Sequence, residues 1–178
     1  AHGLASPAVA AAARDRRALE RLVRAAYGHY LRAYLESLTV ERYARPALAG
    51  RVVADDPARV EAAFGRLAEG RGLIFVGLHF GAIEIPALWT VRRRGLSVTS
   101  PMETLGDADL QAFMLDRRGR AGLSLIPVQG AHRGLAERLA AGEIVGLVAV
   151  REGGGVGARV ELFGAPTRLP LGPAALAL

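Results

Sequence analysis

His79 and Glu84 are the residues in this sequence whose types and spacing best suit a chemical role. An imidazole can take a proton from a hydroxyl near neutral pH, and a carboxylate on its second nitrogen can orient it. Side chains five residues apart can meet across a turn, whereas on one continuous helix they point to different faces. The pair therefore predicts a general base oriented by an acid, with a turn between them.

The neighbouring residues predict that turn. Residues 73–77 are a short apolar run after the glycine turn at 70–72, which is typical of a strand buried on both faces. Pro86 fits the first turn of a helix far better than its interior, so a helix should begin near Glu84. His79 should then lie beyond the carboxyl end of a strand, where open α/β sheets bind their ligands.

The same spacing occurs a second time, in His132 and Glu137. Spacing alone is weak evidence, because 17 of the 178 residues are acidic, so a histidine has roughly a one-in-ten chance of an acid five places on. His132 stands beside Arg133 and Arg138, in a stretch typical of a solvated helix surface. The context therefore places the predicted site at His79.

Composition excludes several kinds of chemistry. The 178 residues suit one domain with a substantial core. The chain has no cysteine, which excludes disulfides, thiolate metal sites and cysteine nucleophiles. All 23 basic residues are arginine, so a lysine-dependent phosphate loop and Schiff-base chemistry are excluded as well. No metal site, cofactor or nucleic-acid platform is predicted.

A basic amphipathic helix is predicted near the N-terminus. Apolar residues from Leu19 to Leu38 recur at three- and four-residue intervals, and residues 1–50 hold eight arginines and four acids, for +4 of the total +6. The helix could pack on the domain core, which we favour, or lie in a membrane interface with its tyrosines at headgroup level. We divide the chain into this segment, 1–50, and an α/β core, 51–178.

Strands and helices are expected to alternate through the core. The expected strands are 51–53, 73–77, 96–102, 123–127, 144–150 and 159–163, and the expected helices are 57–69, 84–94, 107–120 and 132–141. This order predicts a mixed, mainly parallel sheet covered by helices on both faces. Residues 153–158 match the glycine spacing of a dinucleotide fingerprint, but a strand follows rather than a helix, so we interpret residues 153–157 as a hairpin connection.

With these pieces in order, the chain resembles the bacterial lipid A biosynthesis acyltransferases, which include the phosphatidylinositol mannoside acyltransferases of actinobacteria. The resemblance runs from about Arg14 to the end and is most specific in residues 79–84 and 163–177. Arg118 with Gly122 resembles the family's arginine–three–glycine element, and Glu103 falls where members often have an acid. Arginine richness without lysine favours the actinobacterial branch.

The resemblance implies a glycerolipid acyltransferase-like fold and transfer of an acyl group from acyl-CoA or acyl-carrier protein to a hydroxyl of a membrane glycolipid. His79 would be the base, and Glu84 would hold its imidazole. Arg118 or Arg117 would bind phosphate on donor or acceptor, and a salt bridge with Asp116 or Glu103 is an equal alternative for these arginines. Such an enzyme would sit peripherally on the anionic cytoplasmic face of the plasma membrane.

Two departures from the family pattern bear on activity. Members commonly carry an acid–basic–acid element after the last apolar strand, whereas here Val150 replaces the first acid before Arg151 and Glu152. These two residues join Glu103 as further substrate-binding candidates. The family also continues beyond Leu178, so we expect the chain to be truncated at its C-terminus. The alternative function is therefore a catalytically silent fragment that binds lipid or acyl chains.

Overall fold

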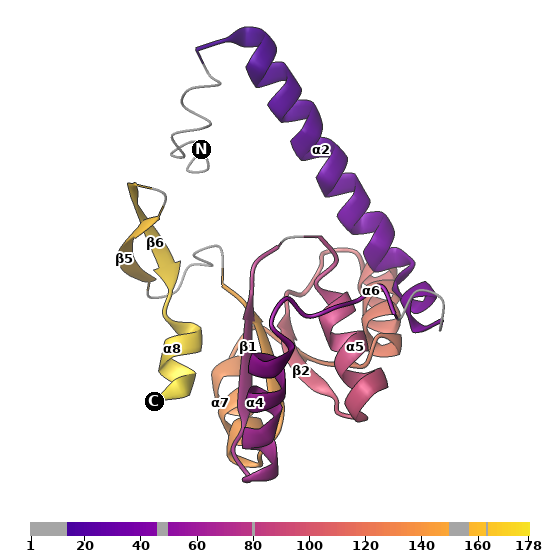
Figure 1. Cartoon of the computed structure of the whole chain (residues 1–178), viewed down its shortest axis with the longest axis vertical. Coiled ribbons are helices and arrows are strands. Elements are labelled where there is room, and N and C mark those ends of the chain that lie inside the picture. The colour runs from indigo at the N-terminus through magenta and orange to yellow at the C-terminus, as the bar shows by residue number, and fades with distance from the viewer. Residues whose placement is uncertain (1–13, 46–49, 80, 150–156, 163) are drawn as a thin grey trace.

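The fold is built on a four-stranded parallel sheet (Figure 1). The computed structural model describes residues 14–45, 50–79, 81–149, 157–162 and 164–178. The strands are β1 (Leu73–Gly77), β2 (Val98–Met102), β3 (Leu123–Pro127) and β4 (Ile144–Val148), in the order β1-β4-β2-β3. Each pairing in this sheet is parallel, so the carboxyl ends of all four strands lie at one edge.

The chain passes through three helices on its way along the sheet. α5 (Glu84–Arg94) joins β1 to β2, α6 (Ala108–Arg120) joins β2 to β3, and α7 (Ala131–Ala140) joins β3 to β4. β4 then pairs with both β1 and β2. The segments that follow β1 and β2 therefore leave the same edge of the sheet, on either side of the end of β4.

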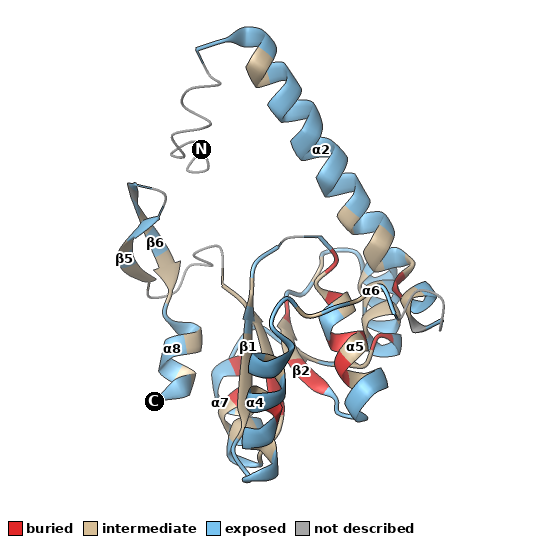
Figure 2. Cartoon of the chain, in the orientation of Figure 1, coloured by how far each residue is buried: buried red, intermediate tan, exposed pale blue. Residues whose placement is uncertain are grey.

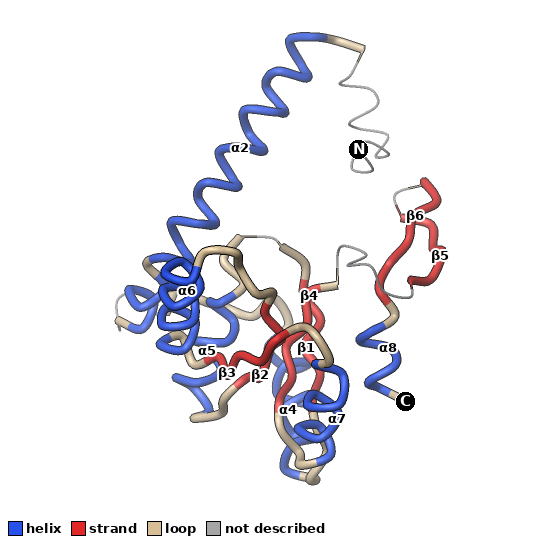
Figure 3. The backbone as a smooth tube through the Cα atoms, turned by 180° about the vertical axis from the view of Figure 1, so that it is seen from behind, coloured by secondary structure: helices blue, strands red, loops and turns tan. Residues whose placement is uncertain are grey.

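Helices cover both faces of the sheet, as predicted. On one face, Phe64 of α4 (Pro57–Ala68) and Ala87 of α5 pack against Val98 and Ile144. On the other, α7 packs on Val145, and α8 (Gly172–Ala177) adds to the same cluster. Ile144 and Val145 are neighbours in the chain and face opposite ways, as the strand pleat requires. Figure 3 shows the sheet from behind.

Local signals fix the helix boundaries. The side chain of Asp56 accepts a hydrogen bond of 2.9 Å from the backbone N–H of Arg59, and that of Asp107 accepts one of 2.8 Å from Leu110, so both are helix caps. Gly95 ends α5 with a φ of 65°, a left-handed conformation that glycine adopts without strain. These residues are the reason that most predicted boundaries agree with the structure within about two residues.

The predicted strand at 51–53 is wrong. These residues form a turn and an irregular segment, and Val53 is 80% exposed. Two valines give this stretch a high β-propensity, but propensity forms no strand where a neighbouring strand is not available to pair with it. Tertiary packing, rather than local β-propensity, therefore determines the conformation of residues 51–53.

The interpretation of residues 153–157 as a hairpin connection falls, up to residue 156, outside the described residues, but the strand after them pairs with a later strand and not with β4. β5 (Gly157–Leu162) pairs antiparallel with β6 (Ala165–Pro170) in a separate two-stranded ribbon. The sequence did not predict β6, since Pro166 and Pro170 argue against a strand. A ribbon of two strands tolerates proline, because each strand has an edge that forms no ladder hydrogen bonds. The connection up to residue 156 lies outside the described residues.

The N-terminal helix is a long element of which only one end packs on the core. α2 (Arg16–Leu38) runs unbroken through Gly28 and has no buried residue (Figure 2). The favoured interpretation, packing along the core, is therefore wrong for most of its length. The 3₁₀ helix η2 (Val40–Ala44) follows it, and Val40, only 1% exposed, packs with Leu88 and Ala121. This cluster attaches the foot of α2 to α5 and to the end of α6.

Candidate active site

Glu84 is the centre of the candidate site. It is the first residue of α5 and is only 2% exposed. Ser37 Oγ donates a hydrogen bond of 2.7 Å to its Oε2, and Arg118 Nε donates one of 2.9 Å to its Oε1. A buried carboxylate is costly unless it is paired and hydrogen-bonded. Here α2 and α6 each supply one donor, and the helix N-terminus adds a favourable dipole.

Gly122 explains why Arg118 can reach this carboxylate. Gly122 has a φ of +89°, and a Cβ atom built there would collide with the side chain of Val91 on α5. The residue at this position must therefore be glycine if the end of α6 is to lie directly against α5. Arg118 stands four residues earlier, in the last turn of α6, and its guanidinium meets the N-terminus of α5. The arginine–three–glycine spacing thus has a packing origin.

His79 lies beyond the carboxyl end of β1, as predicted, and its side chain is exposed. Across the described residues, the hydrogen bonds to the Glu84 carboxylate come from Ser37 and Arg118, and His79 contributes none. A carboxylate has about four lone-pair sites, so two accepted bonds leave room for an imidazole N–H. Phe80, between the two candidates, lies outside the described residues. The dyad and the roles of its two residues stay a prediction.

The second histidine–acid pair differs from the first in the burial of its acid. The Glu137 side chain is 66% exposed and bonds to Arg133 at 2.9 Å, whereas the Glu84 side chain is 3% exposed. His132 and His79 are both exposed, so the histidines alone do not separate the two pairs. The acids do, because a buried carboxylate interacts far more strongly with a nearby imidazolium than a solvated one does.

The remaining predicted site residues are spread over the fold. Arg117 Nη1 lies 3.5 Å from Glu41 Oε1, and its guanidinium carbon lies 5.2 Å from the centre of the Phe113 ring. Glu103 follows β2 at the carboxyl edge of the sheet and is exposed. Arg118 was expected to pair with Asp116 or Glu103 if it formed a salt bridge. In the structure its carboxylate partner is Glu84.

Arg151 and Glu152, the last two predicted site residues, lie outside the described residues. Arg120 is a further arginine at the end of α6. The hydrogen bond that it donates to Asp116, together with the charges of Asp116 and Glu41, raises the pKa of this guanidinium. The Arg120 side chain stays charged at every relevant pH, so it gives the protein no pH dependence.

Sequence reasoning missed Ser37, which is separated from its partner by 47 positions. A serine in the last turn of an amphipathic helix gives no local sign of such a contact. Glu41 was missed for the same reason, although it pairs with both Arg117 and Arg120. Only the packing of η2 on α5 and α6 brings these residues into range.

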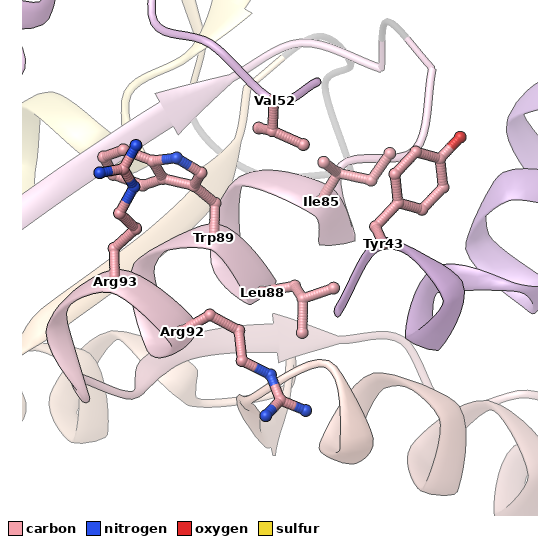
Figure 4. A pocket seen from close by; sticks show the side chains of 7 residues that line it. All are labelled: Tyr43, Val52, Ile85, Leu88, Trp89, Arg92 and Arg93. Carbon is pink, nitrogen blue, oxygen red and sulfur yellow. The ribbon is translucent and has the colours of Figure 1, made fainter. Parts of the chain in front are cut away.

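A small, mainly apolar pocket is lined partly by α5, the helix that begins at Glu84 (Figure 4). Arg92 and Arg93 contribute to its lining, and its apolar side chains are Tyr43, Val52, Ile85, Leu88 and Trp89. Its volume of about 40 Å³ is far below the roughly 300–1,000 Å³ of typical ligand pockets. The pocket is therefore too small for an acyl chain.

The sequence comparisons assign the chain to a family of acyl-transferring enzymes. Residues 11–178 match the family described as bacterial lipid A biosynthesis acyltransferase. This match covers nearly the whole chain, and the chain belongs to that family. Residues 79–84 and 163–177, with Arg118 and Gly122 between them, were the residues that indicated it from the sequence.

The curated relatives are mycobacterial. A protein of Mycobacterium tuberculosis (strain ATCC 25618 / H37Rv) named phosphatidylinositol mannoside acyltransferase is 35% identical over 116 residues, covering 63% of this chain and 36% of the relative. A protein of the same name from Mycolicibacterium smegmatis is 29% identical over 161 residues, covering 88% of this chain and 52% of the relative. The chain thus spans about half, or less, of the length of these relatives.

Proposed function

We propose that the protein transfers a fatty acyl group from an acyl thioester to a hydroxyl of a membrane glycolipid of the phosphatidylinositol mannoside type. Acyl-CoA or acyl-carrier protein would be the donor, and no further cofactor is required. Membership of the acyltransferase family and the names of the mycobacterial relatives support this proposal. The observation that carries it is the buried, doubly hydrogen-bonded Glu84, five residues after a histidine at the sheet edge.

The proposed reaction needs one base and one acid. His79 takes the proton of the acceptor hydroxyl while the hydroxyl oxygen attacks the thioester carbonyl carbon. A carbon–oxygen bond forms, the carbon–sulfur bond breaks, and the imidazolium returns its proton to the leaving thiolate. Glu84 orients the imidazole and stabilises its charged form. For this, the exposed His79 has to turn towards the carboxylate once substrate occupies the sheet edge.

We also propose that α2 attaches the protein to an anionic membrane surface. Large side chains on α2 are exposed, among them Tyr27 at 66%, Tyr30 at 59% and Leu31 at 61%, and arginines are distributed along the same helix. Such a helix lies well in a membrane interface. No helix in the described parts of the chain has the length and apolarity to cross a membrane. The proposed location is the cytoplasmic face of the plasma membrane.

The decisive experiment is an acyl-transfer assay on the full-length protein that contains this chain. Radiolabelled lauroyl-CoA and palmitoyl-CoA are offered together with phosphatidylinositol mannoside in mixed micelles, and labelled lipid products are separated by chromatography. Transfer that is lost in His79→Ala but retained in His132→Ala is the expected result. The absence of labelled glycolipid with the wild-type protein, under conditions where it binds both substrates, would refute the proposal.

A second candidate, a catalytically silent protein that binds lipid or acyl chains, is favoured by one observation. The exposed His79 makes no hydrogen bond to Glu84 within the described part of the chain. Such a protein would bind an acyl-CoA without turning it over. Thioester cleavage, followed as release of free CoA, separates the two candidates.

A further inference from the structure

The foot of α2 reaches into the region of the proposed site. Ser37, in the last turn of α2, donates its hydrogen bond to Glu84 Oε2 across 47 positions of sequence. Glu36, one residue earlier, approaches the turn that follows His79, because a methyl group placed on Gly81 would lie 3.7 Å from Glu36 Oε2. Val40 then anchors the chain in the buried cluster on α5. Two successive side chains of α2 thus lie beside the predicted dyad.

We propose that Ser37 is a positioning residue for acyl transfer and that, through it, the foot of α2 is part of the active site. The proposal rests on the proposed role of Glu84 as the acid partner of His79. Arg118 holds one carboxylate oxygen from α6, and Ser37 holds the other from α2. Two donors from separate elements fix the plane of the carboxylate, whose terminal torsion is otherwise soft.

The geometry at Ser37 differs from an ordinary contact at a helix end. A serine or threonine near a helix C-terminus commonly bonds back to a carbonyl one turn earlier. Thr39 does this, with its Oγ1 2.6 Å from the carbonyl oxygen of Leu35. Ser37 instead donates to a buried carboxylate on another element, and hydrogen bonds to charged acceptors are about twice as strong as neutral ones. The two hydroxyls therefore form a matched pair for experiment.

A fixed carboxylate affects the rate more than substrate binding. The lone pairs that remain on Glu84 must face the imidazole, and a misplacement of about 1 Å at an active site can cost ~100-fold in rate. The carboxylate itself does not touch the substrate in the proposed reaction. Loss of the Ser37 hydroxyl should accordingly reduce kcat and leave KM nearly unchanged.

The test compares Ser37→Ala, Ser37→Thr and Thr39→Ala in the full-length protein, with the acyl-transfer assay described above. Ser37→Ala should lower kcat about 10- to 100-fold, the range for a hydrogen bond to a charged group. Ser37→Thr keeps the hydroxyl and should recover kcat to within a few-fold of wild type. Thr39→Ala removes a hydroxyl from the same helix end and should keep the wild-type kcat. Thermal unfolding is measured on every variant.

Three results would overturn the positioning role: wild-type kcat in a folded Ser37→Ala, equal loss in Ser37→Thr and Ser37→Ala, or a loss confined to KM. If Ser37→Ala does not fold, Ser37→Cys replaces it, since it is nearly isosteric and carries only a weak S–H donor. The same kcat loss is expected, and failure of both to fold would assign Ser37 a structural role. A wild-type protein without transfer would instead refute the proposed function, whereas loss in Glu84→Gln with none in Ser37→Ala would remove only this inference.

Discussion

The acid of the proposed dyad is held in place before any base reaches it. Glu84 is 2% exposed and accepts one hydrogen bond on each carboxylate oxygen. Neither donor is a histidine, so its orientation does not depend on the position of His79. A preorganised carboxylate of this kind costs no reorganisation during the reaction, which is the property that electrostatic catalysis requires.

Replacing Glu84 by glutamine should separate folding from catalysis. An amide fills the same space, and the Ser37 hydroxyl can rotate to accept from its N–H₂ group, so Glu84→Gln should remain folded. The neutral amide cannot stabilise an imidazolium, so acyl transfer should fall at least ~100-fold. Circular dichroism and the acyl-transfer rate are measured on one preparation. A well-folded Glu84→Gln with the wild-type rate would remove the acid from the mechanism.

Replacing each of the two histidines by alanine should have very different effects on the acyl-transfer rate. His79→Ala should lose at least ~100-fold in rate, the low end for a general base. His132→Ala should stay within a few-fold of wild type, because its acid partner Glu137 is solvated and already bonded to Arg133. The reverse ranking in the same assay would place the site at the wrong histidine.

At the scale of single residues, the sequence could indicate Glu84 as the acid but not the residues that hydrogen-bond to it. Glu84 follows an apolar strand and precedes Pro86, so its place at a helix start was readable from neighbouring residues. Its two hydrogen-bond partners come from residues 37 and 118, and no local pattern encodes such contacts. Arg118 was predicted to bind a phosphate or a different carboxylate for this reason.

Among the elements, the packing of α6 on α5 depends most sharply on one residue. Gly122→Ala would place a methyl group against Val91 and force an alanine into a left-handed φ of +89°. We expect a loss of about 1–3 kcal/mol in the free energy of unfolding, as for other overpacked sites, measured by urea denaturation. Arg118 would move with the helix end, so the acyl-transfer rate should fall as well.

Gly119 provides the matched control in the same helix. A Cβ atom at Gly119 would meet nothing within 4 Å, so the added methyl group has space. Alanine is favoured over glycine in a helix by about 1 kcal/mol, and Gly119→Ala should be neutral or stabilising. Equal destabilisation by both substitutions would show that the helix, and not the contact with Val91, is the sensitive feature.

The exposed face of α2 should determine membrane binding. Tyr27→Ser with Leu31→Ser removes two large exposed side chains and should weaken sedimentation with phosphatidylglycerol-containing vesicles at least ~10-fold. Added salt should weaken wild-type binding too, because it screens the attraction between the arginines of α2 and the anionic lipids. Leu162→Ser, on β5, is the control for general loss of exposed apolar surface. Unchanged vesicle binding in the α2 variant would contradict this role.

Sequence patterns predicted elements well where local chemistry and packing agree. The strands at residues 73–77 and 123–127 were predicted with the observed bounds, since glycine turns or helix caps flank them. The patterns failed at residues 51–53, where β-propensity had no partner strand, and at β6, where two prolines hid a ribbon strand. Whether α2 packs on the core or lies exposed could not be decided from its stripe, because both uses require the same periodicity.

At the scale of the whole molecule, two elements of the described part of the chain lie away from the sheet. α2 and the β5–β6 ribbon stand away from the sheet and account for the open outline in Figure 1. Much of the exposed area on α2 is apolar.

This exposed apolar surface leads to a prediction for the 178-residue chain in isolation. It should self-associate or have a low melting temperature. Exposed apolar faces favour association, and the buried core is small for the chain length. Sedimentation velocity over a concentration series should show a rising average mass, and calorimetry should show a broad transition. A monodisperse monomer with a sharp transition at high temperature would contradict it.

The position of β4 between β1 and β2 has a consequence for how the protein emerges from the ribosome. Ser37, Glu84 and Arg118 all precede β4 in the chain and leave the exit tunnel before it does, so the carboxylate cluster can assemble early. β1 cannot find its place in the sheet then, because Leu73 pairs with Ile144 and Gly77 with Val148. Domains often fold while synthesis continues, and distant strand pairs form late. The histidine end of the site is thus expected to be completed last during translation, so the nascent chain would have its acid in place well before its base.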